Sequence, residues 1–99
     1  MGRVGFRNSK MQRRIVYYSG NVQGVGFRYT VKNLSIQYDI NGYVRNLPDG
    51  RVEVVMEGAE VELERLSSDV RRKMNPFIKQ VHSAEMPATG EFDAFAIRH

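Results

Sequence analysis

The chain of 99 residues contains no cysteine, no tryptophan and only three prolines. The absence of cysteine excludes disulfide bonds and thiolate metal sites, so the protein needs no oxidising compartment. No apolar run approaches the roughly 20 residues that cross a bilayer, and the N-terminal region lacks the apolar centre of a signal peptide. The sequence therefore predicts a cytoplasmic protein without a membrane partner.

Acidic residues are missing from the first 14 positions, where five of the 15 basic residues lie, namely Arg3, Arg7, Lys10, Arg13 and Arg14. The rest of the chain carries the other ten basic residues and all 11 acidic ones. The formal net charge of +4 therefore comes from these first residues, which we call the leader. The leader is also polar and aperiodic. We therefore expect a flexible basic N-terminal arm at residues 1–12 and a single folded domain at residues 13–99.

Along the domain, the spacing of hydrophobic residues switches between that typical of strands and that typical of helices. The patterns predict strands at 14–19, 43–47 and 51–57, helices at 27–38 and 59–74, and one or two final strands within 78–85 and 93–98. Within 51–57, apolar residues alternate with mostly charged ones, so one face of that strand is expected to be packed and the other solvated. The order β-α-β-β-α-β predicts an α+β fold, the ferredoxin-like sandwich of an antiparallel sheet with two helices on one face.

A glycine-rich stretch, GNVQGVGFR from Gly20 to Arg28, joins the first predicted strand to the first predicted helix. Successive N–H groups of such a loop converge on one point, and the N-terminus of the helix adds partial positive charge there. Arg28 contributes a planar guanidinium that matches two phosphate oxygens. The stretch has neither the Gly-Lys-Ser/Thr ending of a P-loop nor the glycine spacing of a Rossmann motif. We therefore expect a phosphate-binding site formed by Arg28 and the backbone N–H groups of Gln23, Gly24, Val25, Gly26 and Phe27.

The second informative stretch runs from Gly42 to Glu53 and reads GYVRNLPDGRVE. Together with GNVQGVGFR, it resembles the two motifs of the acylphosphatases, small enzymes that hydrolyse carboxyl-phosphate anhydrides. The resemblance covers most of residues 13–99. It implies hydrolysis of acyl phosphates to carboxylate and inorganic phosphate, with Arg28 and Asn46 at the two catalytic positions and with no metal or other cofactor.

The expected topology brings the two motifs together. The first two strands run parallel and flank the third, so their C-terminal ends lie at the same edge of the sheet. The glycine-rich loop leaves the first strand at that edge, and Asn46 ends the second. The resemblance then implies that Arg28 clamps the phosphoryl group and that Asn46 holds the attacking water, which an amide orients through its carbonyl and NH₂ groups.

Two other functions are compatible with parts of the sequence. A nucleic-acid-binding module is one, because RNA recognition domains share this topology and the leader is basic, but the strand at 51–57 has no aromatic cluster on which bases stack. A regulatory anion-binding or carbamoyl-handling module is the other, since acylphosphatase-like domains also occur inside larger proteins.

The expected partners are a small-molecule acyl phosphate and inorganic phosphate, without nucleic acid, and the expected state is a monomer. His82 and His99 are expected to be incidental, because their spacing to other residues does not suggest a metal site.

Overall fold

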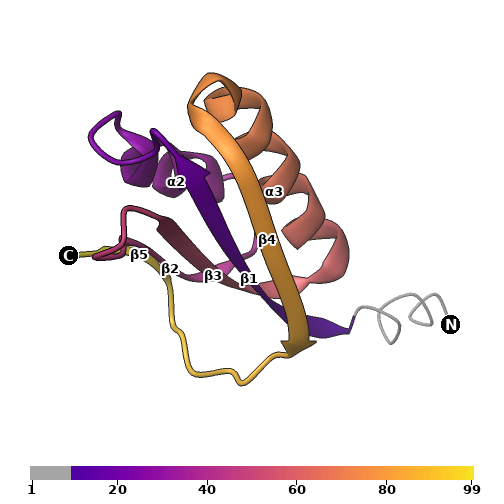
Figure 1. Ribbon diagram of the computed structural model, residues 1–99. Coiled ribbons are helices and arrows are strands. Elements are labelled where there is room, and N and C mark those ends of the chain that lie inside the picture. The colour runs from indigo at the N-terminus through magenta and orange to yellow at the C-terminus, as the bar shows by residue number, and fades with distance from the viewer. Residues whose placement is uncertain (1–9) are drawn as a thin grey trace, which may run out of the picture.

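Five strands and two α-helices alternate along residues 10–99, the part of the chain that the computed structural model describes (Figure 1). The elements in chain order are β1 (Met11–Gly20), α2 (Phe27–Ser35), β2 (Asn41–Asn46), β3 (Val52–Ala59), α3 (Glu60–Met74), the 3₁₀-helix η1 (Asn75–Phe77), β4 (Ile78–Pro87) and β5 (Phe95–Arg98). Most of the predicted basic arm, residues 1–9, lies outside the described residues. The division of the chain at residue 12 stays a prediction.

The strands form one sheet in the order β4-β1-β3-β2-β5. β3 pairs antiparallel with both β1 and β2, so β1 and β2 run parallel to each other on its two sides, as predicted. The α+β ferredoxin-like fold is confirmed, with α2 and α3 on the same side of the sheet (Figure 1). The sheet departs from the antiparallel arrangement at one pair of strands, because β5 pairs parallel with β2 and makes the sheet mixed.

The first strand is longer than predicted and contains two residues that the sequence assigned to the basic leader. β1 begins at Met11, three residues before the predicted start at Arg14. Arg13 and Arg14 each face a carboxylate of a neighbouring strand: Arg13 Nε lies 2.7 Å from Glu57 Oε2, and Arg14 Nη2 lies 2.6 Å from Glu85 Oε2. Arg13 and Arg14, which the charge count placed with the basic leader, therefore form ion pairs within the folded domain.

The first helix is shorter than predicted. α2 ends at Ser35, and tight turns follow in which Gln37 N donates to Leu34 O at 3.2 Å and Tyr38 N donates to Ser35 O at 3.1 Å. The sequence predicted a helix as far as Tyr38 because the apolar residues keep helical spacing up to that position. The turns after Ser35 still place the Tyr38 ring against the core, so the spacing continues although the helix has ended. Within residues 10–99, no helix is long and apolar enough to span a membrane.

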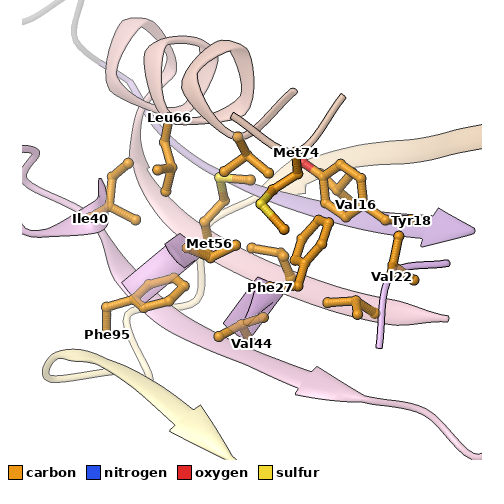
Figure 2. Close-up of a cluster of buried hydrophobic side chains, with 14 of the residues drawn as sticks. Val16, Tyr18, Val22, Phe27, Ile40, Val44, Met56, Leu66, Met74 and Phe95 are labelled. Carbon is orange, nitrogen blue, oxygen red and sulfur yellow. The ribbon is translucent and has the colours of Figure 1, made fainter. Parts of the chain in front are cut away.

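The hydrophobic core fills the space between the two helices and the sheet face that they cover (Figure 2). Tyr18 of β1 and Phe27 of α2 pack with their ring centroids 5.0 Å apart. Val44 of β2 and Met56 of β3 are fully buried beside them, and Met74 comes from α3. Because Phe27 is the first residue of α2, its burial fixes the start of that helix and the end of the loop before it.

The side of β3 that faces away from the helices is buried, so the prediction of a solvated face on β3 was wrong. Glu53 and Glu57 of β3 are only 6% and 5% exposed. The segment between β4 and β5 supplies N–H groups to Glu57, from Thr89 and from Gly90, each at 2.9 Å. The carboxylate of Glu57 is therefore surrounded by N–H groups of the β4–β5 connection and not by water. The alternation of apolar and charged residues along a strand does not show which of the two covers the charged side.

We predict that Glu57→Gln lowers the free energy of unfolding at pH 7 by about 1.5–3 kcal/mol, the range for hydrogen bonds to a charged group. Burial by itself raises the pKa of Glu57, but the N–H groups of Thr89 and Gly90 and the side chain of Arg13 outweigh it and lower the pKa from 4.5 to about 2. Because the folded-state pKa is below the unfolded value, the carboxylate stabilises the fold above pH 4.5, and this stabilisation is lost as the pH falls towards 2.

Denaturant unfolding at several pH values between 7 and about 2 measures this contribution. Asp93→Asn is the matched control, because Asp93 is an exposed carboxylate in the same β4–β5 connection. Glu57→Gln should flatten the acid-dependent loss of stability, whereas Asp93→Asn should leave it intact. An unfolding free energy with the same pH dependence in wild type and Glu57→Gln contradicts the assignment.

Candidate active site

The loop between β1 and α2 is held to the core at both of its ends. Val22 is fully buried and Phe27 is 2% exposed, and both side chains point into the core (Figure 2). The four residues between them, Gln23 to Gly26, are exposed. The two apolar anchors therefore fix a short segment of exposed backbone at the surface.

Two glycines give this segment its shape. Gly24 and Gly26 both have φ of +79°, whereas Val25 between them has negative φ. A Cβ atom at either glycine meets nothing within 4 Å, so the backbone conformation and not lack of space favours glycine there. Alternation of this kind turns successive N–H groups toward a common side, as in backbone nests that bind anions.

The N–H groups of this segment have no hydrogen-bond acceptor among residues 10–99. Gly26 is the N-cap residue of α2, and its carbonyl accepts a hydrogen bond from Thr30 N at 3.0 Å. Within residues 10–99, no backbone carbonyl accepts a hydrogen bond from the N–H groups of Gln23 to Phe27. The free donors and the helix N-terminus together favour an anion at this position.

Arg28, in the first turn of α2, is half-buried beside this segment. Its Nη1 lies 3.2 Å from Nδ1 of His99, which accepts the hydrogen bond because a guanidinium only donates. In the described part of the chain, no carboxylate forms an ion pair with Arg28. Its positive charge is thus available to an anion, and His99, which the sequence gave no reason to place here, is its neighbour.

Asn46 reaches the same site from the end of β2. It pairs with Val52 of β3 and is half-buried. Asn46 lines a hollow of about 110 Å³ together with Val22, Gly24, Gly26, Phe27, Arg28 and Tyr29. A water molecule occupies roughly 30 Å³ in the liquid, so the hollow has room for a few groups of that size. The structure therefore brings Asn46, Arg28 and the glycine-rich loop together at one edge of the sheet.

The turn after Asn46 is held by its own polar contacts. Asp49 accepts hydrogen bonds from the backbone N of Arg51 at 3.1 Å and from its Nε at 2.8 Å. The backbone N–H of Arg51 lowers the pKa of the Asp49 carboxyl, and its guanidinium adds to the effect. Asp49 therefore stays ionised within the turn at neutral pH, close in sequence to the proposed water-binding residue.

Two larger hollows, of about 360 Å³ each, lie along α3. Their linings include Asp69, Arg71, Arg72 and Lys73. Neither contains a glycine-rich backbone or a helix N-terminus, so the smaller hollow at Asn46 is the better candidate for phosphate chemistry. In the residues that the structure describes, no group of three or more His, Cys, Asp or Glu side chains is arranged to hold a metal ion.

A glycine-rich loop, a helix N-terminus and an arginine around one hollow on a ferredoxin-like fold form a candidate site for a phosphate-type anion in a small α+β protein. The acylphosphatase family model matches residues 14–97 of the chain. The chain belongs to the acylphosphatase family, as the resemblance of its two motifs predicted.

Individual relatives agree with this membership. An acylphosphatase of Syntrophus aciditrophicus is 41% identical over 88 residues, which cover 88% of this chain and 92% of the relative. An acylphosphatase of Archaeoglobus fulgidus is 45% identical over 71 residues, covering 72% and 78%. The crystal structure of an acylphosphatase from Bacillus subtilis has a TM-score of 0.77 and 34% identity, and the match covers 90% of this chain and 99% of that one.

Neither a nucleic-acid-binding nor a purely anion-binding module is favoured by these findings. The aromatic rings on the sheet face opposite the helices are also occupied, because the Arg98 guanidinium lies 3.9 Å from the centroid of the Tyr43 ring and the Arg51 guanidinium 4.6 Å from that of Tyr17. Bases stack on open ring faces in nucleic-acid modules of this topology. Each of these two rings instead contacts an arginine of the protein itself.

Proposed function

We propose that this protein hydrolyses the carboxyl-phosphate anhydride bond of acyl phosphates, which gives a carboxylate and inorganic phosphate. The observation that carries the proposal is the convergence of Arg28, Asn46 and the glycine-rich loop on one hollow in a chain of the acylphosphatase family. The roles of the individual residues are part of the proposal.

The phosphoryl group binds to the N–H groups of Gln23 to Phe27 and to the guanidinium of Arg28. The loop anchors at Val22 and Phe27 preorganise these donors, so little reorganisation is needed when charge spreads over the phosphoryl oxygens. Arg28 matches two of those oxygens with two parallel N–H groups. Phosphoryl transfer depends mainly on such positioning and charge stabilisation.

Asn46 holds the attacking water through its amide. The water oxygen forms a bond to phosphorus while the bond from phosphorus to the carboxyl oxygen breaks, and the carboxylate leaves with that electron pair. The protons of the water pass to phosphoryl oxygens or to solvent. A carboxylate leaving group needs little protonation, so the site functions without a His, Cys or carboxyl side chain as general acid.

No metal or other cofactor takes part in this scheme, because Arg28 and the loop dipoles supply the positive charge. The test is hydrolysis of acetyl phosphate or benzoyl phosphate by the purified protein, with and without exhaustive chelation. Activity that persists in EDTA agrees with the proposal, whereas activity lost in EDTA and restored by a divalent ion refutes the metal-free scheme. An absence of hydrolysis under all conditions refutes the proposed function itself.

The proposed partners are small molecules, an acyl phosphate and inorganic phosphate, and the proposed state is a cytoplasmic monomer that binds neither membrane nor nucleic acid. Sedimentation velocity tests the monomer. Cell fractionation tests the location. Retention on nucleic acid at several salt concentrations tests the expectation that the protein does not bind nucleic acid.

Inorganic phosphate is expected to raise the melting temperature, because a ligand that binds only the folded state stabilises it by mass action. At a concentration of about 100 Kd the gain is about 2.7 kcal/mol, or roughly 10–20 °C for a domain of this size. Thermal scans across a phosphate series measure the shift, and the rate assay should show competitive inhibition. If saturating phosphate changes neither the melting temperature nor the rate, the loop is not the phosphate site.

A further inference from the structure

The side chain of Gln23 joins the glycine-rich loop to the hairpin formed by β2 and β3. Its Nε2 atom donates hydrogen bonds to two backbone carbonyls, Leu47 O at 2.9 Å and Arg51 O at 3.0 Å. The same two residues close the hairpin, since Leu47 N donates to Arg51 O at 2.8 Å. One amide group therefore spans the base of the turn that directly follows Asn46.

Between Val22 and Gly26, Gln23 is the one residue whose side chain can make this connection. Gly24, Val25 and Gly26 carry no polar side chain. The side chain of Val22 is apolar and points into the core (Figure 2). Both acceptors on the hairpin are carbonyls, so the group that contacts them has to present N–H donors, and the amide of Gln23 presents two.

Asn46 lies directly before the base of this turn. Asn46 and Leu47 are consecutive, so their Cα atoms lie about 3.8 Å apart across a trans peptide. Gln23 holds the carbonyl of Leu47 while its own N–H group belongs to the proposed phosphate-binding segment. A displacement of about 1 Å between reacting groups lowers turnover on the order of a hundredfold in other enzymes.

We propose that Gln23 is a positioning residue, whose two hydrogen bonds to the hairpin set the distance between Asn46 and the phosphate-binding loop. The inference rests on the proposed function, because it assigns Gln23 a part in the same reaction. The two bonds are exposed, so their contribution to the stability of the fold is small. Their effect falls on the alignment of the water with the phosphoryl group.

The experiment combines Gln23→Met with Asn46→Ala. Methionine has nearly the length of glutamine and no donor, so Gln23→Met should lower kcat for acetyl phosphate on the order of tenfold, while the inhibition constant of inorganic phosphate changes by less than about twofold. In the Asn46→Ala background the same substitution should lower kcat by less than about twofold, because its effect acts through Asn46. The control is Gln37→Met, the same change at an exposed glutamine outside the hollow.

Three results overturn the inference: wild-type kcat in Gln23→Met, an equal loss of kcat in both backgrounds, or a loss of phosphate affinity that matches the loss of kcat. If the wild-type protein hydrolyses no acyl phosphate, the proposed function fails separately. The NMR signals of the Asn46 side-chain amide then test the positioning directly. Broadening in Gln23→Met but not in Gln37→Met supports the inference, and identical signals in the two variants overturn it.

Discussion

Replacing Arg28 with alanine is expected to abolish phosphate binding and to lower turnover by on the order of a thousandfold or more, the scale at which an arginine that stabilises a transferring phosphoryl group acts. Arg28 is half-buried beside the free N–H groups of the loop, and no carboxylate among residues 10–99 forms an ion pair with it. In the proposed mechanism its charge stabilises the anion in both ground and transition states, so KM should rise and kcat should fall. Steady-state kinetics with acetyl phosphate and phosphate titrations followed by melting temperature measure the two losses.

Arg28→Lys should restore little of either property, because an ammonium has one charge centre and lacks the bidentate geometry of the guanidinium. Arg65→Ala is the matched control, since Arg65 is an exposed arginine of α3 outside the hollow. It should leave binding and turnover unchanged. Near-complete rescue by lysine would show that charge alone is needed, and intact phosphate binding in Arg28→Ala would remove Arg28 from the site.

The fold was predictable because local signals and topology agree. Strand residues such as Val52 and Val54 alternate toward the core, and the apolar residues of α3 recur at helical spacing, so the order of elements follows from periodicity. The place of β5 in the sheet was not predictable in the same way, because a short strand contains too few residues to show a hydrophobic pattern. Its parallel pairing with β2 depends on the path of the connection that precedes it. The burial of Glu57 has the same origin, since Thr89 and Gly90 lie more than 30 residues away.

The arrangement of the candidate site was predictable where the chain itself places residues next to one another. Arg28 directly follows the glycine-rich loop, and the crossover from β1 to β2 brings Asn46 to the same edge. Contacts between distant side chains had no such signal: His99 meets Arg28 across 71 residues, and the amide of Gln23 meets carbonyls 24 and 28 residues away. Backbone carbonyls belong to every residue, so a sequence does not indicate which of them a glutamine contacts.

Asn46→Ala is expected to bind inorganic phosphate nearly as well as wild type and to lose on the order of a hundredfold or more in kcat, the scale for removal of one positioned polar group from an active site. In the proposed mechanism the phosphate donors lie on the loop and on Arg28, whereas Asn46 of β2 acts on water, so phosphate binding and turnover should be affected separately. Phosphate inhibition constants and kcat, measured on the same preparation, check this. The control is Asn33→Ala, an exposed asparagine of α2 outside the hollow.

Asn46→Asp tests the chemical role of the amide at unchanged size. A carboxylate beside the bound phosphoryl group should repel it, so the variant should bind phosphate more weakly than Asn46→Ala and should not recover kcat. The repulsion should diminish when the pH is lowered far enough to protonate the new carboxyl group, which a pH series of phosphate inhibition measures. If Asn46→Asp instead hydrolysed acyl phosphates faster than wild type, the reaction would require a general base at this position, and the assignment of Asn46 as the residue that orients the water would be wrong.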